Sequence, residues 1–273
     1  MIPKGVTEIG LDKYGQISFF DGCDNLVSVV VEIGNPVYDS RDNCNAIIET
    51  STNTLLVACS GTTIPNSVTA VHKTAFKGCD SLTSISIPGS ITNIPRGAFR
   101  NCSGLKIVNI NEGVTSIGEE AFAGCSSMES IFLSSTVTTI DDEAFRSCPS
   151  LTSITVDANN QTFDSRNNCN AIISTAENKL ILGCRNTVIP SSVTIIGEAA
   201  FMGSGIVNCS IPNGVKTIEE TAFYEVENLE SLNIPNSVDS IGRECIVKCP
   251  NLKTVTIGSG IKFIGKSNFS GCI

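Results

Sequence analysis

The feature that most constrains this chain is a pattern that recurs every 23 residues. Four Ala-Phe pairs mark it, and a cysteine follows each phenylalanine three residues later: Ala75-Phe76, Ala98-Phe99, Ala121-Phe122 and Ala144-Phe145. A fixed period in the twenties is typical of solenoids, in which each repeat forms one coil stacked on its neighbours. We therefore expect like side chains of successive repeats to lie in columns.

Each short repeat has the same internal order. In the segment 82–87, apolar residues alternate with serines, which predicts a strand with its apolar side chains turned inward. A second short strand places Ile91 and Ile94 inward, and a helical turn follows in which Ala98 and Phe99 fill the coil. Acidic pairs stand where these turns begin, where unpaired backbone N–H groups favour negative charge: Glu119-Glu120, Asp141-Asp142 and Glu219-Glu220.

Two longer units interrupt the short ones, at about 33–63 and 157–188. The sequence of residues 39–48 recurs almost unchanged at 164–173, a shift of 125 positions. Each long unit reads as a β-hairpin, with the strands at 46–49 and 55–59, and at 171–174 and 180–184. The expected fold class is an α/β solenoid with a parallel β-sheet, short helical turns and two hairpin insertions, as one array over residues 1–273.

The first unit carries a small insertion at 11–16, and Phe20 to Cys23 with Leu26 to Val31 complete it. Neither end of the chain shows the polar cap that solenoids need. We interpret the chain as a segment of a longer array, or as one that leaves its last rung open.

Composition excludes several classes of partner. The net charge is −9 and charged residues make up 16% of the chain, which argues against nucleic acid and against an anionic membrane surface. No stretch approaches the ~20 apolar residues of a membrane-spanning helix, so we expect no membrane insertion of this segment. The N-terminus has no charged region followed by an apolar one, so we expect no signal peptide within this segment.

Thirteen cysteines suggest two readings. Seven occupy one position of the repeat, three residues after its phenylalanine or isoleucine: Cys23, Cys79, Cys102, Cys125, Cys148, Cys249 and Cys272. A column of buried thiols, each packing as a small hydrophobe, gives no cysteine a unique partner. We prefer this inert column to a disulfide framework, which is the alternative.

The repeat I-P-x-x-V-T-x-I-G-x-x-A-F-x-G-C-x-x-L-x-S-I-x-I, carried by residues 64–87 and by 189–201, resembles the BspA-like leucine-rich repeats of bacterial and protozoan surface proteins. The resemblance implies a secreted or surface-anchored protein that binds host matrix proteins or other cells. It carries over no catalytic residue, because that family has no shared active site.

Outward positions of the long strands form two columns of mostly small polar residues. They run from Ser28 to Thr254 and from Val30 to Thr256. Ile107 and Phe132 break the pattern, and such a pair is an anchor for a partner or simply two exposed apolar side chains. The candidate binding residues are Ile107, Asn109, Ser130, Phe132, Ser153 and Thr155. The alternative is an inert solvated sheet.

The hairpin cysteines offer a second candidate feature. Cys44 and Cys59, like Cys169 and Cys184, would lie opposite each other if the hairpin turns at 51–52, which allows a cross-strand disulfide in an oxidising compartment. The other reading is four unlinked thiols.

His72 is the sole histidine. The chain has no catalytic triad, no metal-ligand spacing and no phosphate-binding loop, so we expect no metal, no cofactor and no enzymatic activity.

Two functions remain open. The first is a non-catalytic recognition or adhesion module, extracellular or at the cell surface, that binds a host extracellular-matrix or cell-surface protein, or a glycan, through the sheet face. The alternative is a structural spacer within a larger multidomain surface protein.

Overall fold

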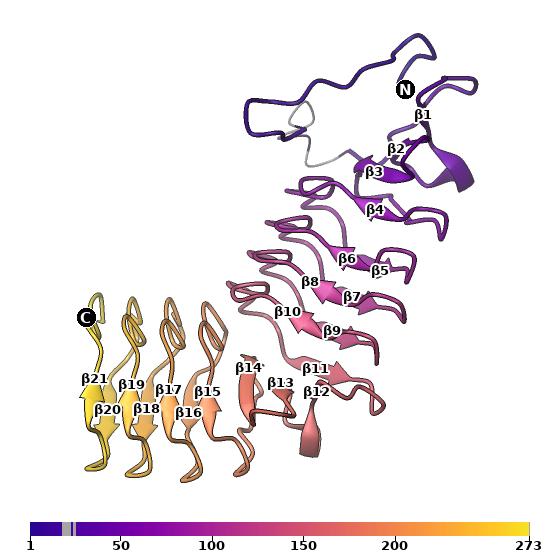
Figure 1. Ribbon diagram of the computed structural model, residues 1–273. Helices are drawn as coiled ribbons and strands as arrows, with labels where there is room; N and C mark the ends of the chain where they lie inside the picture. The colour runs from indigo at the N-terminus through magenta and orange to yellow at the C-terminus, as the bar shows by residue number, and fades with distance from the viewer. Residues whose placement is uncertain (18–22, 24–25, 273) are drawn as a thin grey trace. The chain divides into compact units, whose positions relative to one another are not determined.

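The computed structural model describes residues 1–17, 23 and 26–272 (Figure 1). It contains two compact units, 1–128 with 136–145, and 129–135 with 146–273. The described strands and 3₁₀ helices are, in chain order, β1 (Tyr38–Asp39), η1 (Arg41–Asn43), β2 (Ile47–Glu49), β3 (Thr54–Val57), β4 (Ala70–Val71), β5 (Ser84–Ile87), β6 (Asn93–Ile94), β7 (Ile107–Ile110), β8 (Ser116–Ile117), β9 (Ser130–Leu133), β10 (Thr139–Ile140), β11 (Ser153–Val156), β12 (Phe163–Asp164), η2 (Arg166–Asn168), β13 (Ala171–Ser174), β14 (Lys179–Gly183), β15 (Ile195–Ile196), β16 (Asn208–Ser210), β17 (Thr217–Ile218), β18 (Ser231–Ile234), β19 (Ser240–Ile241), β20 (Thr254–Ile257) and β21 (Phe263–Ile264).

In the first unit, strands of successive coils pair in parallel. The long strands β5 and β7 align Ser84 with Ile107, and the short strands β6, β8 and β10 form their own ladder. Each paired residue is one period of 23 away from its partner. The predicted stacking of equivalent residues is therefore confirmed within this unit.

The second unit repeats the arrangement. The long strands β9 and β11 pair in parallel, as do β16, β18 and β20. A ladder of short strands runs through β15, β17, β19 and β21. Long and short strands of neighbouring coils can be followed side by side in Figure 1. The expectation that residues 1–273 form one continuous array stays a prediction.

A stack of phenylalanine rings fills the coils, as the period predicts. In the first unit, the ring centroids of Phe76, Phe99, Phe122 and Phe145 are 4.6, 5.0 and 5.2 Å apart in turn. Phe201 and Phe223 stack at 5.1 Å in the second unit. These six side chains are at most 4% exposed. Because apolar area leaves water at every coil, each added repeat contributes its own share of the core.

The expected helical turns are wrong, and the fold is a β-solenoid. Within the described residues, the helical segments are the three-residue η1 and η2. In segment 95–102, the N–H groups of Gly97, Phe99 and Asn101 donate to carbonyls of the next coil at 2.8–3.0 Å. An α-helix would send each N–H to the carbonyl four residues back. Positive φ angles at Gly97 and Asn101 also interrupt a right-handed helix.

The acidic pairs accordingly do not begin helices. Glu120 accepts a hydrogen bond from Nη1 of Arg100 at 2.8 Å, Glu219 pairs with Nζ of Lys179 at 2.7 Å, and Glu220 pairs with Arg243. These carboxylates therefore join neighbouring segments of the solenoid through ion pairs.

Both predicted hairpins are present. Strands β2 and β3 pair antiparallel in the first copy, and β13 and β14 in the second. Each hairpin has an additional antiparallel strand that the sequence analysis missed, β1 and β12 respectively. Strands β3 and β14 then pair in parallel with the short strands β4 and β15. The second hairpin thereby continues the ladder of short strands β15, β17, β19 and β21, whereas the sheet of the first hairpin ends at β4.

Part of the expected first unit, residues 18–22 and 24–25, lies outside the described residues. In the described remainder, Val31 forms an isolated parallel bridge with Ile2.

Candidate functional site

The outward face of β5 and β7 is polar with one exception. Ser84, Ser86 and Asn109 are exposed, and Ile107 is 45% exposed. The alternate residues of both strands are at most 5% exposed and belong to the core. Strand alternation thus separates a buried apolar face from a solvated one, as the pattern indicated.

Four of the six candidate binding residues come together on β9 and β11 in the second unit. Ser130 pairs with Ser153, and Phe132 pairs with Thr155. Ser153 and Thr155 are exposed, whereas Ser130 and Phe132 are half-buried. Ile107 and Asn109 lie on β7, in the first unit. The binding role of all six residues stays a prediction.

Some polar side chains on these faces bond to one another. Nδ2 of Asn111 donates to Oγ of Ser86 at 3.0 Å, and Oγ of Ser231 donates to Oδ1 of Asn208 at 2.6 Å. Such bonds hold the side chains in place, so the face presents ordered donors and acceptors. This chemistry suits recognition of hydroxyl or amide groups.

The hairpin cysteines are not bonded to one another in the structure, and their register differs from the expected one. Near the turn, Ile48 pairs with Leu55, but a bulge between Ile47 and Ile48 shifts the pairing by one residue. Sγ of Cys59 therefore contacts the carbonyl of Asn45 at 3.2 Å, whereas Sγ of Cys44 lies 4.0 Å from the carbonyl of Ala46.

The second hairpin repeats this arrangement, with Sγ of Cys184 3.3 Å from the carbonyl of Asn170. Burial raises the pKa of the thiols of Cys44, Cys169 and Cys184 above its ordinary value. A disulfide in either hairpin stays a prediction.

The cysteine column makes a contact that the sequence analysis did not anticipate. Sγ of Cys102 donates to the carbonyl of Phe76 at 2.9 Å, and Sγ of Cys249 to that of Phe223 at 3.1 Å. Each of these two thiols therefore bonds to the backbone of the preceding coil. Burial, the largest cause, raises the pKa of Cys249 to about 12. A thiol held protonated in this way is a weak nucleophile.

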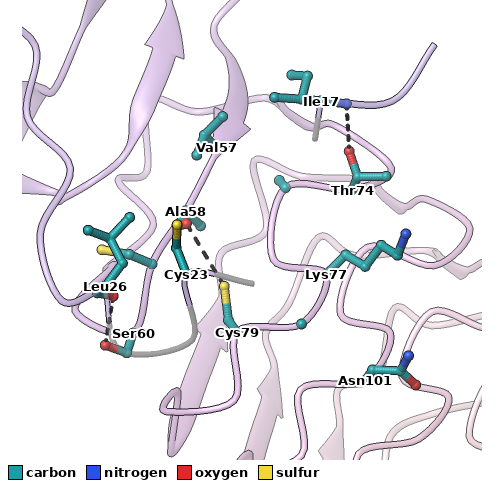
Figure 2. A pocket seen from close by; sticks show the side chains of 13 residues that line it. Ile17, Cys23, Leu26, Val57, Ala58, Ser60, Thr74, Lys77, Cys79 and Asn101 are labelled. Carbon is teal, nitrogen blue, oxygen red and sulfur yellow. Dashed lines mark hydrogen bonds between the residues drawn. The ribbon is translucent and has the colours of Figure 1, made fainter. Parts of the chain in front are cut away.

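A cavity of 260 Å³ opens beside the first hairpin (Figure 2). Its described lining includes Cys23, Cys59 and Cys79 together with Leu26 and Val57. Figure 2 shows Sγ of Cys79 bonded to the carbonyl of Ala58, at 3.9 Å. The described lining contains no carboxylate and no imidazole, so these residues supply no general base of either type.

His72 has a structural environment. Its Nδ1 lies 3.0 Å from Oγ1 of Thr74, and burial, with a smaller contribution from Lys73, lowers the pKa of the imidazole. Among residues 1–17, 23 and 26–272, no three His, Cys, Asp or Glu side chains cluster as a metal site would require. The same residues include no helix with the length and apolar character that crossing a membrane requires.

Sequence reasoning missed a basic hollow of 350 Å³ in the first unit. Its lining includes four cations, in two columns with a step of 23, which are Lys73 with Arg96 and Lys77 with Arg100. Tyr14 and Gln16, from the insertion, also line it. The repeat spacing of the four cations was the available sequence signal.

Several solved structures are similar to this chain. A leucine-rich repeat protein from Eubacterium ventriosum is 20% identical with a TM-score of 0.50, over 83% of this chain and 73% of that one. A leucine rich cell surface protein from Faecalibacterium prausnitzii is 23% identical, with a TM-score of 0.41, over 87% and 81%. The pneumococcal vaccine antigen PcpA is 20% identical, with a TM-score of 0.40, over 68% and 66%. The first of these shows a shared fold and no more.

A search of curated proteins found no match. The family model described as "BspA type Leucine rich repeat region (6 copies)" matches residues 46–173 and 179–273. The repeat spacing, the paired ladders and this match over most of the chain agree, and the chain belongs to the BspA-type leucine-rich repeat family.

Proposed function

We propose that the chain is a non-catalytic recognition module that binds an extracellular-matrix or cell-surface protein, or a glycan, through the outward face of its long strands. Membership of the family supports a recognition or structural role, and its solenoid fold is generally non-enzymatic. We propose a location outside the cell or at its surface, which the resemblance to this family supports.

The observation that carries the proposal is the regular outward face. On β9 and β11, the half-buried Phe132 has Ser130, Ser153 and Thr155 at neighbouring outward positions in a fixed register. An aromatic side chain with small polar groups beside it is a common arrangement at the centre of a binding surface. Small side chains also lose little conformational entropy when a partner covers them.

Direct binding measurements test the proposal. The protein is screened on immobilised matrix proteins and on a glycan array, and the ligands found are measured again with Phe132→Asp. We expect binding to weaken at least about tenfold, because a charge is placed where an apolar side chain would be covered. Val188→Asp is the matched control, since Val188 is 74% exposed in the same unit and lies outside the long strands.

Equal affinity of wild type and Phe132→Asp for every ligand would remove this face from consideration. The alternative is a structural spacer. It is favoured by surface ion pairs that join successive coils, such as Lys253 with Glu230 at 3.1 Å and Lys262 with Asp239 at 2.9 Å. A screen that yields no ligand would support the spacer.

A further inference from the structure

The basic hollow belongs to only one of the two copies of the repeated architecture. Phe76 in the first copy corresponds to Phe201 in the second, and both N–H groups donate to an alanine carbonyl one coil further on, at 3.1 and 2.8 Å. The cations near Phe76 have different counterparts near Phe201. Lys73 corresponds to Glu198, and Lys77 to Met202.

The next coil shows the same difference. Phe99 corresponds to Phe223, so Arg96 is replaced by Glu220, and Arg100 by Tyr224. Because the second copy builds the same turns without any of these four cations, the fold does not require them. Their grouping in the first copy therefore calls for another explanation.

An insertion found only in the first copy covers the same place. The loop 11–16 is closed by Asp12, whose Oδ1 accepts the N–H groups of Tyr14 at 2.8 Å and Gln16 at 2.9 Å. The N–H of Ile17 donates to Oγ1 of Thr74 at 3.3 Å, which attaches the loop to the coil (Figure 2). The loop thus lines the hollow through Tyr14 and Gln16, together with the turns that bear the cations.

The two lysines hold positive charge that no described carboxylate neutralises. Arg96 pairs with Glu119 at 3.0 Å, and Arg100 pairs at 2.8 Å with Glu120, a carboxylate that also lines the hollow. Nζ of Lys73 instead bonds the carbonyl of Tyr14 at 2.7 Å, and Nζ of Lys77 bonds Oε1 of Gln16 at 3.3 Å. Within the described part of the chain, neither ammonium has an acidic partner. The hollow is therefore a local group of positive charges on a chain that is acidic as a whole, with a net charge of −9.

We propose that this hollow binds an acidic oligosaccharide through a sulfate or carboxylate group, an inference that rests on the recognition function proposed above. The ammonium groups of Lys73 and Lys77 would give the anion charge-assisted hydrogen bonds. Nζ of Lys13 lies over one face of the Tyr14 ring, 4.9 Å from its centroid. Tyr14 is 63% exposed, so its ring offers the other face to a sugar, and the amide of Gln16 offers polar contacts. The strongly acidic remainder of the protein repels a long polyanion such as nucleic acid, so a short ligand is favoured.

The test is calorimetric titration of the protein with four short probes. They are a heparin tetrasaccharide, a hyaluronan tetrasaccharide, neutral maltotetraose and a single-stranded tetranucleotide. We expect one or both acidic sugars to bind, which identifies the anionic group, while maltotetraose and the tetranucleotide do not. Affinity should fall as salt concentration rises, because screening weakens exposed charge pairs.

Matched variants locate the site. Lys73→Gln with Lys77→Gln should weaken binding about tenfold or more, and Lys73→Arg with Lys77→Arg should retain it. Lys253→Gln with Lys262→Gln removes the same charge from the second unit and should change the affinity less than about twofold. Unchanged thermal unfolding will show that the variants fold.

Three results would overturn the inference: no binding of either acidic sugar, equal binding by the Lys73→Gln, Lys77→Gln variant, or equally tight binding of the tetranucleotide. The Phe132→Asp variant separates this site from the sheet face. If that variant loses its screened ligand but wild type ignores acidic sugars, the recognition function stands and only this inference fails.

Discussion

Replacing Phe99 by alanine is the most informative change to the core. Its side chain is 1% exposed, and its ring lies between those of Phe76 and Phe122, at centroid distances of 4.6 and 5.0 Å. Loss of a buried phenylalanine with incomplete collapse costs about 3–5 kcal/mol. Two stacked neighbours put the cost at the upper end of that range, since each aromatic pair adds about 0.5–1.5 kcal/mol.

Urea unfolding, followed by far-ultraviolet circular dichroism, measures the loss, and hydrogen exchange shows whether it falls in the first unit. Phe132→Ala is the control. It makes the same chemical change at a half-buried position on the outward face, and we expect it to cost about 1 kcal/mol. If Phe99→Ala cost no more than Phe132→Ala, the stacked rings would not support the coils and the reasoning would be refuted.

Two further predictions concern the side-chain contacts of Arg166 and the buried thiols of Cys209 and Cys245. Arg166 forms two hydrogen bonds with the carboxylate of Asp164, at 2.8 and 2.7 Å, and a third with Oδ1 of Asn178 at 2.8 Å. Arg166→Ala should therefore lower the unfolding free energy by about 1–3 kcal/mol. Arg185→Ala, at an exposed arginine, is the control, and an equal loss in this variant would contradict the stabilising role of the Arg166 contacts. Burial raises the pKa of Cys209 and of Cys245 from 9.0 to about 12. Above pH 9 the unfolded chain loses these protons while the folded chain keeps them, so the unfolding free energy should fall between pH 9 and 12. Replacing both cysteines by alanine should flatten that slope, and an unchanged slope would show that these thiols do not cause it.

The columns were predictable because the repeat itself encodes them. Phe76, Phe99, Phe122 and Phe145 share one position in a fixed period, and a solenoid is the fold that stacks such positions. The inward strand residues followed from alternation for the same reason. Both inferences use information that each repeat carries locally, and both agree with the structure.

The turns were not predictable from local sequence. Segments such as Glu119 to Phe122 have residues that suit a helix. In these turns, however, alternate N–H groups such as those of Gly97 and Phe99 donate to carbonyls of the next coil, 21 or 22 residues further along the chain. The register expected for the hairpin differs from the observed one for a related reason. The bulge beside Ile47 is a feature of the backbone that no distinctive residue marks in the sequence. The hollow at Lys73 needs the insertion to fold over it, which spacing alone does not reveal.

The central claim is that each turn bonds to the next coil, which is what places like side chains in register. In the structure, the N–H of Phe99 donates to the carbonyl of Ala121 at 2.8 Å. Nuclear magnetic resonance on deuterated protein detects this bond directly, through the scalar coupling that a hydrogen bond transmits between the donor nitrogen and the acceptor carbonyl carbon. We expect a coupling between the nitrogen of Phe99 and the carbonyl carbon of Ala121. A coupling from Phe99 to the carbonyl of Pro95 would instead show a helical turn, and it would contradict the stacked-coil account.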